Sequence, residues 1–383
     1  MTITRGYFRT RRKYLLGLAV RAADRPLRAV ACALVPRPAE PPGAWRRGLI
    51  VGHPHIGDVL YRTASLGPLA ESFPRCEWHF LAAPGSAQVL RGNPHLAAVH
   101  ADSVGDEAWQ LAPGALARLR RLDFDVVLCT NSVRYYADLA LALRLRAPSR
   151  VGFTYKGLGG LVTHPVPIDF PSPYPAYFRG MVAALAGRPP TWGLRPRVYP
   201  GPADTDRAAA VMREVGLDSG APIVVTVLTQ RQKGEIWPIG HWLDALRLVH
   251  RATDSVVALC GAAEDSEFLA AVARRADFPM RVLAGRLDLL AFAEMLRRSA
   301  VFFGVDSGPR HLANAAGIPV VFFRHLAYLR AEAGAYCDAE TDLSPPDAEL
   351  LTRPAQRDVL ARIAPDVVAE RVISAVADRR RQG

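Results

Sequence analysis

Four short segments of this 383-residue chain combine ionisable or histidine side chains with the ends of apolar runs. Each apolar run has the length and composition of a buried strand in a parallel sheet. Ligands bind beyond the carboxyl ends of such strands in open α/β sheets, so the four segments are candidate parts of a binding site. Their polar residues and glycines are His53, His55, Gly57 and Asp58; Arg231 and Lys233; Glu264; and Asp306, Ser307, Gly308 and His311.

The last of these segments has the features of an anion-binding turn. It lies between two apolar runs and predicts a short helix that Ser307 or Asp306 caps and Gly317 ends. Free backbone N–H groups and the helix dipole would point at a ligand there. Gly308 permits close approach, and His311 lies about one turn into the helix, within reach of the same ligand. An ordinary strand–turn–helix connection explains these residues equally well.

A carboxylate after the first strand, Asp58, is the candidate general base, because it is placed to accept a proton from a hydroxyl group. The alternative is that Asp58 only caps a helix beginning at Val59. His53 and His55 are candidates to bind a sugar or a phosphate, or they simply line the loop. We group these two histidines with Gly57 on the side of the predicted site that would hold the molecule with the reacting hydroxyl group, which we call the acceptor side.

The remaining candidates would bind a nucleotide. Arg231 and Lys233 can neutralise a leaving diphosphate, and their alternative is a solvated loop. Glu264 can hold ribose hydroxyls, and its alternative is favourable placement at a helix N-terminus. No metal site is predicted, because the histidines lack zinc spacing and the Asp123–Asp125 pair opens an apolar strand.

The net charge of +12 is concentrated at the N-terminus, where residues 1–47 hold eleven basic residues and two acids. Residues 5–35 mix this charge with apolar residues at helical spacing. The pattern favours a basic amphipathic helix on an anionic membrane surface. The alternatives are a solvated helix packed on the protein and a secretory signal, whose apolar core would be only seven residues long. The other 336 residues carry only +3 without interleaved aromatic residues, which argues against nucleic-acid binding.

The cysteines and the hydropathy bear on location. The five cysteines are scattered without a C-x-x-C motif, which favours a reducing cytoplasm. No apolar run approaches the roughly 20 residues that span a bilayer. We therefore expect a cytoplasmic protein, peripheral on the inner face of the cytoplasmic membrane.

Strands and helices alternate twice along the chain, which predicts an α/β protein with two Rossmann-like doubly wound domains. The expected divisions are a basic extension at 1–47, a first domain at 48–185, a second at 186–345 and a C-terminal tail and helix at 346–383. Residues 154–205 are rich in proline and glycine, and we interpret them as a connection between the domains.

Several motifs, in order, give the chain a resemblance to glycosyltransferase family 9, the heptosyltransferases. They are Gly57-Asp58, the Gly92-to-His95 stretch, Trp237-Pro238, the segment from Gly285 and the Asp306-to-Pro319 stretch, within residues 48–330. The resemblance implies the GT-B fold, in which an N-terminal acceptor domain and a C-terminal nucleotide-sugar domain face each other across a cleft. It implies inverting, metal-independent transfer, typically of heptose from ADP-heptose to a lipopolysaccharide core, without a further cofactor.

Carried over residue by residue, Asp58 resembles the base, Lys233 the phosphate-binding lysine and Glu264 the ribose ligand. Asp306, Ser307, Gly308 and His311 resemble the turn that binds the sugar and the diphosphate. Lys233 lies four residues before Trp237, where the family usually has two, so Arg231 competes for its role.

Arg324 and His325 replace the family's usual Gly-Pro. Two further hypotheses remain open beside the heptosyltransferase: a transferase that uses another nucleotide-sugar, and a non-catalytic nucleotide-sugar-binding protein of the same fold.

Overall fold

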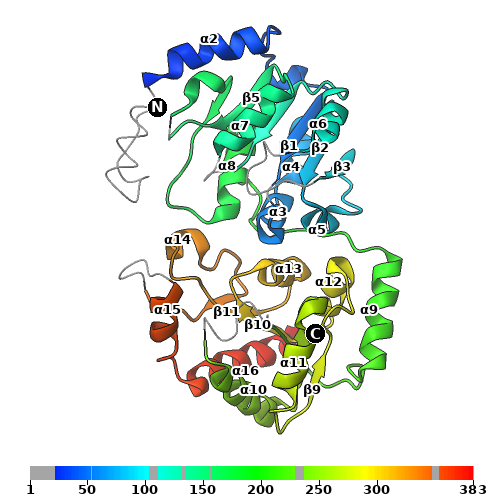
Figure 1. Cartoon of the computed structure of the whole chain (residues 1–383). Coiled ribbons are helices and arrows are strands. Elements are labelled where there is room, and N and C mark those ends of the chain that lie inside the picture. The colour runs from blue at the N-terminus through cyan, green and yellow to red at the C-terminus, as the bar shows by residue number, and fades with distance from the viewer. Residues whose placement is uncertain are drawn as a thin grey trace. The chain divides into compact units, whose positions relative to one another are not determined.

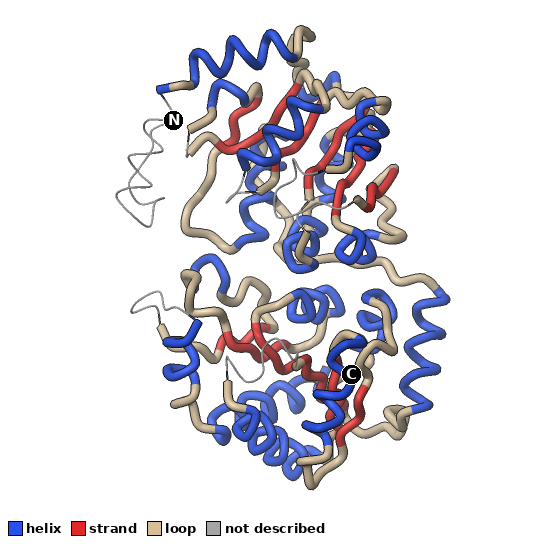
Figure 2. The backbone as a smooth tube through the Cα atoms, in the orientation of Figure 1, coloured by secondary structure: helices blue, strands red, loops and turns tan. Residues whose placement is uncertain are grey.

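The computed structural model describes residues 22–52, 54–102, 111–131, 135–155, 157–228, 237–346 and 353–382. The chain divides into two compact units, residues 1–194 and 195–383 (Figure 1). Both units place helices around a central sheet, as the colouring by secondary structure in Figure 2 shows. Within the described residues, no helix is both long enough and apolar enough to span a bilayer.

The first unit is built around a six-stranded parallel sheet with the strand order β3-β2-β1-β4-β5-β6. Its strands are β1 Arg47–Val51, β2 Glu77–Ala82, β3 Ala98–Ala101, β4 Val126–Cys129, β5 Ser149–Phe153 and β6 His164–Val166. Its helices are α2 Asp24–Leu34, α3 Ile56–Thr63, α4 Leu66–Ser72, α5 Pro84–Ala87, α6 Pro113–Arg120, α7 Tyr135–Arg144 and α8 Tyr174–Ala186, with short 3₁₀ turns at Pro42–Ala44, Gln88–Leu90 and Gly159–Leu161.

The second unit repeats this architecture with the strand order β12-β11-β10-β7-β8-β9, again parallel throughout. Its strands are β7 Ile223–Val227, β8 Val256–Cys260, β9 Met280–Val282, β10 Val301–Val305, β11 Val320–Phe323 and β12 Glu340–Asp342. Its helices are α9 Pro202–Glu214, α10 Ile239–Thr253, α11 Ser266–Ala273, α12 Leu289–Arg297, α13 Gly308–Ala316, α14 Arg330–Ala333, α15 Arg353–Leu360 and α16 Pro365–Gln382, with a 3₁₀ turn, η6, at Ala263–Asp265.

Both sheets confirm the predicted doubly wound α/β fold. In each sheet the strand order reverses direction once, between β1 and β4 in the first unit and between β7 and β10 in the second. Loops leave such a switch point on opposite sides of the sheet, which opens a crevice at the carboxyl ends of the two strands. Asp306 directly follows β10, and Asp58 lies in the first turn of α3 after the β1 loop, so the fold brings each candidate to the switch point of its own unit.

The structure corrects two predicted elements of the first unit. The proline-rich connection contains β6, which pairs with β5 at the edge of the sheet and places Pro165 beside Gly152. Proline is tolerated there because the outer edge of an edge strand makes no ladder hydrogen bonds, so a backbone N–H is not needed on that side. The helix predicted to begin at Val59 begins instead at Ile56, and α3 is followed after a short break by α4.

The core of the second unit is aromatic and includes the C-terminal helix. Trp242 packs on Phe303 with ring centroids 4.1 Å apart, and Trp237 packs on Phe323 at 5.1 Å. The C-terminal helix α16 adds buried valines and an alanine to this cluster. Trp237 also donates a hydrogen bond through Nε1 to the carbonyl oxygen of Ile363, 3.1 Å away, and so ties the start of α10 to the segment before α16.

The helix α2 packs on the first unit through a glycine contact. It buries Ala31 against the unit. A Cβ atom added to Gly160 would lie 1.9 Å from the carbonyl oxygen of Asp24, so only glycine allows the helix this close. The described part of the basic segment is therefore a helix packed on the protein, one of the alternatives that the sequence left open. Residues 5–21 lie outside the described residues.

Replacing Gly160 with alanine is expected to displace α2 and to reduce the free energy of unfolding by about 1–3 kcal/mol, the usual effect of overpacking. Faster proteolysis within α2, together with a lower urea midpoint, would report the change. Gly180→Ala in α8 is the matched control, because a Cβ there meets no atom within 4 Å. Equal stability and equal proteolysis in the two variants would contradict the close contact.

Candidate functional site

Asp58 lies in the first turn of α3, directly after the loop that follows β1. It is partly exposed, as is Gly57, and His55 is the exposed N-cap residue of the helix. Because α3 begins at Ile56, Asp58 does not cap a helix starting at Val59, and that alternative is wrong. A carboxylate in the first turn is favoured by the helix dipole. His53 lies outside the described residues.

Arg62, one turn after Asp58, fixes this part of α3 to the sheet. Its buried guanidinium donates hydrogen bonds to the backbone carbonyl oxygen of Asp58 and to both Oγ1 and the carbonyl oxygen of Thr130, at 2.5 and 3.3 Å. Thr130 follows β4 and donates its own hydroxyl proton to the carbonyl oxygen of Val51 at the end of β1, 2.6 Å away. The two central strands and the turn that carries Asp58 are thereby joined.

Behind Arg62 lies a buried carboxylate, Asp138 of α7. Its Oδ2 accepts a hydrogen bond from the backbone N–H of Asn131 at 2.9 Å. Burial raises the pKa of Asp138 to about 7, although the Asn131 hydrogen bond and the charge of Arg62 oppose this shift. Burial likewise lowers the pKa of Arg62, while the charges of Asp58 and Asp138 raise it. Two buried ionisable groups, Arg62 and Asp138, therefore lie close to the turn that carries Asp58.

The raised pKa of Asp138 predicts how stability depends on pH. Between the unfolded-state pKa of about 4 and the folded-state value of about 7, the native carboxyl holds a proton that the unfolded chain has released. Rising pH in this window therefore destabilises the native state, by up to about 1.4 kcal/mol per pH unit. Chemical denaturation of the wild type and of Asp138→Asn from pH 4 to 8 would measure how the free energy of unfolding of each changes with pH. A difference between the two that is constant with pH would contradict the shift.

In the second unit, the predicted anion turn forms at the end of β10. Ser307 occupies the N-cap position of α13, and Gly317 ends the helix with a φ of 77°. The Ser307 hydroxyl donates to the carbonyl oxygen of Val305 at 3.1 Å, and no side chain at the cap accepts a hydrogen bond from the helix. Ser307 therefore stands at the predicted cap position, but its side chain makes no capping hydrogen bond. Ser307 and Gly308 are both partly exposed.

The Asp306 carboxylate is instead held by a buried arginine. Arg310 is fully buried, and its Nη1 donates to Asp306 Oδ1 at 2.8 Å while its Nε donates to Glu340 Oε1 at 2.6 Å. Its remaining donors reach the carbonyl oxygens of Ala333 and Gly334, and its guanidinium lies 3.5 Å from the ring centroid of Phe322. Both ion pairs have favourable geometry, as a buried pair requires.

The charge of Arg310 shifts the pKa values of both carboxylates, and His311 also contacts this network. Burial alone would raise the pKa of Asp306 and of Glu340, but the Arg310 guanidinium holds the pKa of Asp306 well below its usual value and lowers that of Glu340. His311 is buried, with Nδ1 2.7 Å from the Tyr336 hydroxyl and Nε2 3.4 Å from Asp306 Oδ1. The imidazole therefore packs behind Asp306, and direct contact of His311 with a ligand stays a prediction.

The remaining nucleotide-side candidates lie on neighbouring loops. Glu264 is exposed in η6, the turn after β8, and the neighbouring Asp265 accepts the backbone N–H of Ala262 at 3.1 Å. Strand β7 lies between β8 and β10, so Glu264 and the Asp306 turn follow strands on the two sides of β7. Arg231 and Lys233, in the segment after β7, lie outside the described residues.

Sequence reasoning missed the buried and partly buried residues that support the two candidate turns: Arg62, Thr130, Asp138, Arg310, Tyr336 and Glu340. A local signal existed for the arginines, because each follows its aspartate by four residues on a helix, Asp58 to Arg62 and Asp306 to Arg310. No local signal points to Glu340, which β12 brings to Arg310 from 30 residues away. In the described part of the chain, no group of three or more His, Cys, Asp or Glu side chains is arranged to hold a metal ion.

Comparison with known proteins adds a family match. Residues 115–323 match the sequence model of a family described as glycosyltransferase family 9 (heptosyltransferase). No curated protein matches the chain in sequence.

Solved structures match over most of the chain. A glycosyl transferase family 9 protein from Veillonella parvula DSM 2008 has a TM-score of 0.72 and 17% identity over 88% of this chain and 98% of its own. The E. coli ADP-heptose lps heptosyltransferase II has a TM-score of 0.66 and 18% sequence identity, and the match covers 87% of this chain and 99% of its own. The E. coli heptosyltransferase WaaC with ADP-2-deoxy-2-fluoro heptose has a TM-score of 0.63 and 19% sequence identity, and the match covers 86% of this chain and 99% of its own. At these identities the structures establish the shared GT-B fold.

Proposed function

Because the chain belongs to glycosyltransferase family 9, we propose that it transfers heptose from ADP-heptose to a lipopolysaccharide-core or related glycan or glycolipid acceptor. The reaction would invert the anomeric carbon and need no metal ion. The observation that carries the proposal is the Asp306–Gly308 turn at the carboxyl end of β10, where a family-matched sheet has its switch point. Two similar structures are named for heptose transfer, and one of them holds an ADP-heptose analogue, which favours this donor.

In the proposed reaction, the acceptor hydroxyl oxygen attacks the anomeric carbon of the donor sugar. The carbon–oxygen bond to the diphosphate breaks, and ADP leaves with the electron pair. Asp58 takes the hydroxyl proton, a role for which a partly exposed carboxylate in the first turn of α3 is suited. The buried contacts of Arg62 would hold the α3 turn in place during this step.

The second unit would bind the leaving group. The diphosphate would meet the backbone N–H groups at the start of α13, which no side chain at the cap occupies. Arg231 or Lys233 would supply positive charge, and Glu264 would bind the ribose hydroxyls. Arg310 would keep Asp306 ionised and oriented toward the sugar, because its guanidinium holds the pKa of that carboxyl low.

The basic N-terminal segment would bring the enzyme to its acceptor. Residues 5–35 would contact the anionic inner face of the cytoplasmic membrane. The described helix α2 supports this, because it keeps Arg25 and Arg28 exposed beside exposed Val30 and Leu34.

The experiment that tests the donor is thermal unfolding of the full-length chain with ADP-, UDP- and GDP-linked sugars and with the free diphosphates. A ligand that binds only the native state raises the midpoint in proportion to the logarithm of its concentration over Kd. We expect a selective rise with ADP species and transfer from ADP-heptose to lipopolysaccharide-core acceptors. A selective rise with another nucleotide would replace the proposed donor. Binding without transfer to any acceptor would favour the non-catalytic alternative.

A further inference from the structure

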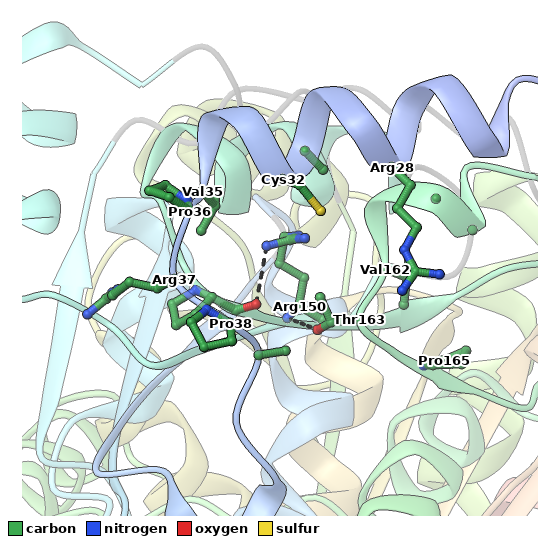
Figure 3. A pocket seen from close by; sticks show the side chains of 15 residues that line it. Arg28, Cys32, Val35, Pro36, Arg37, Pro38, Arg150, Val162, Thr163 and Pro165 are labelled. Atoms are coloured by element: carbon green, nitrogen blue, oxygen red, sulfur yellow. Dashed lines mark hydrogen bonds between the residues drawn. The ribbon is translucent and has the colours of Figure 1, made fainter.

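A pocket of about 510 Å³ lies in the first unit beneath α2, apart from the strand ends that carry the proposed sugar-transfer site (Figure 3). Its floor is formed by the β5–β6 region, and its roof by α2 and the segment that follows it. Much of the wall is apolar, built from prolines, alanines and the valines Val35 and Val162. The charged groups that line it are Arg28, Arg37 and Arg150, and none of its described lining residues is acidic.

Arg150 is the buried cation of this pocket, with an exposed fraction of 5%. Its described hydrogen-bond acceptors are the carbonyl oxygens of Leu161, Ala147 and Pro148, at 2.7, 2.8 and 3.3 Å. Carbonyl dipoles satisfy N–H donors but bring no net charge, and burial lowers the pKa of the guanidinium. An anion in the pocket would therefore relieve an electrostatic penalty that the protein leaves in place.

The other two arginines of the pocket differ in whether their guanidinium groups can reach an anion bound there. Arg37 makes a two-pronged ion pair with Asp123 at 2.9 Å and points away from the pocket centre in Figure 3. Arg28 is exposed and descends from α2 toward Val162, while Arg150 points from the floor toward Cys32. Arg28 and Arg150 thus offer guanidinium groups from the roof and the floor. Asp24, the one acidic residue of α2, is not among the lining residues.

The surroundings of the pocket indicate which anion it takes. Val30 and Leu34 of α2 are 53% and 52% exposed, and they are among the most exposed large apolar residues in the described part of the chain. The segment 1–47 carries a net charge of +9. Exposed apolar residues beside basic ones on one helix are typical of a protein surface that lies in the lipid interface.

We propose that the pocket beneath α2 binds the phosphate of an anionic phospholipid, with Arg28 and Arg150 on the phosphate and Val30 and Leu34 in the lipid interface. Guanidinium groups suit a phosphate because they offer paired, charge-assisted hydrogen bonds. The proposal gives the membrane contact of the N-terminal segment a defined headgroup site. It involves neither the donor nor the acceptor of the sugar transfer, so its failure is distinguishable from failure of the proposed function.

Cys32 provides a local readout, because it is exposed and lines the pocket. The full-length chain is alkylated with a maleimide, and modification of Cys32 is followed by peptide mass spectrometry with and without soluble short-chain phosphatidylglycerol. Co-sedimentation with phosphatidylcholine vesicles, with or without phosphatidylglycerol, measures membrane binding in parallel. Arg28→Gln is compared with Arg25→Gln, which removes the same charge from an exposed position of α2 outside the pocket.

We expect phosphatidylglycerol to slow alkylation of Cys32 in the wild type and in Arg25→Gln but not in Arg28→Gln. Vesicle binding should weaken about fivefold in Arg25→Gln, the effect of one interfacial charge. It should weaken by about tenfold or more in Arg28→Gln, which also loses hydrogen bonds to a charged group. Equal weakening in the two variants, or no protection of Cys32, would overturn the headgroup site. If inorganic phosphate protected Cys32 from alkylation equally well, the ligand would be a free phosphate ion and not a phospholipid.

Discussion

Replacing Asp58 with asparagine is expected to lower the rate of sugar transfer by about a hundredfold to ten-thousandfold, the usual contribution of a general base. An amide of the same size cannot take the acceptor proton, whereas the donor would still bind in the second unit. The thermal shift with the donor should therefore be unchanged while turnover is lost. Single-turnover rates and donor titrations of the same preparation would measure both quantities.

The control for this variant is Glu71→Gln, which removes a negative charge from an exposed position on α4 of the same unit. It is expected to retain the wild-type rate. If Asp58→Asn transfers sugar at a similar rate to Glu71→Gln, Asp58 is not the base. If Asp58→Asn also loses the donor-induced thermal shift, the residue acts in donor binding or folding rather than in proton transfer.

Replacing Arg310 with methionine is expected to reduce the free energy of unfolding by about 3–5 kcal/mol, the range for breaking a buried ion pair on one side. The change leaves Asp306 and Glu340 without their shared cation, and both carboxylates are largely buried. Donor affinity should fall as well, because Asp306 and His311 would lose their fixed geometry. Urea denaturation and donor titration would measure the two effects.

The acid limb of the stability curve gives this prediction a second test. Arg310 depresses the folded-state pKa of Glu340 and of Asp306, so their stabilisation is present above the unfolded-state values of about 4. That stabilisation is lost as the pH falls from there toward the folded-state values. Arg310→Met should therefore show a flatter loss of stability below pH 4 than the wild type. An unchanged acid limb would show that the three charges are not coupled.

Arg247→Met is the matched control for Arg310→Met. Arg247 also contacts two carboxylates, Asp244 and Asp277, each at 2.7 Å, but all three groups are solvent-accessible. Water screens such pairs and replaces the lost contacts, so we expect little change in stability. A loss as large as that of Arg310→Met would mean that burial is not what makes the Asp306–Arg310–Glu340 network important. Restoring part of the stability with Glu340→Gln in the Arg310→Met background would support the coupling.

The sequence alone determined the architecture of each half. Buried parallel strands must be apolar on both faces, so runs such as Val126–Cys129 and Val301–Val305 are recognisable without any knowledge of their neighbours. The turn at Asp306–Gly308 is equally local, because glycine and proline mark a helix start after a strand. These signals depend on residues only a few positions apart, which is why they predicted the alternation of elements and the candidate loops.

Tertiary structure alone decided how the candidate side chains are supported. Strand order, which places the loops after β1 and β10 at the switch points, depends on pairing between distant segments. The same is true of Glu340, which reaches Arg310 only because β12 pairs with β11. Asp306 was expected at a helix cap, yet a buried guanidinium binds its carboxylate more strongly than exchangeable backbone N–H groups do. Local patterns thus identified which residues stand at the site, and long-range packing decided which charge each of them meets.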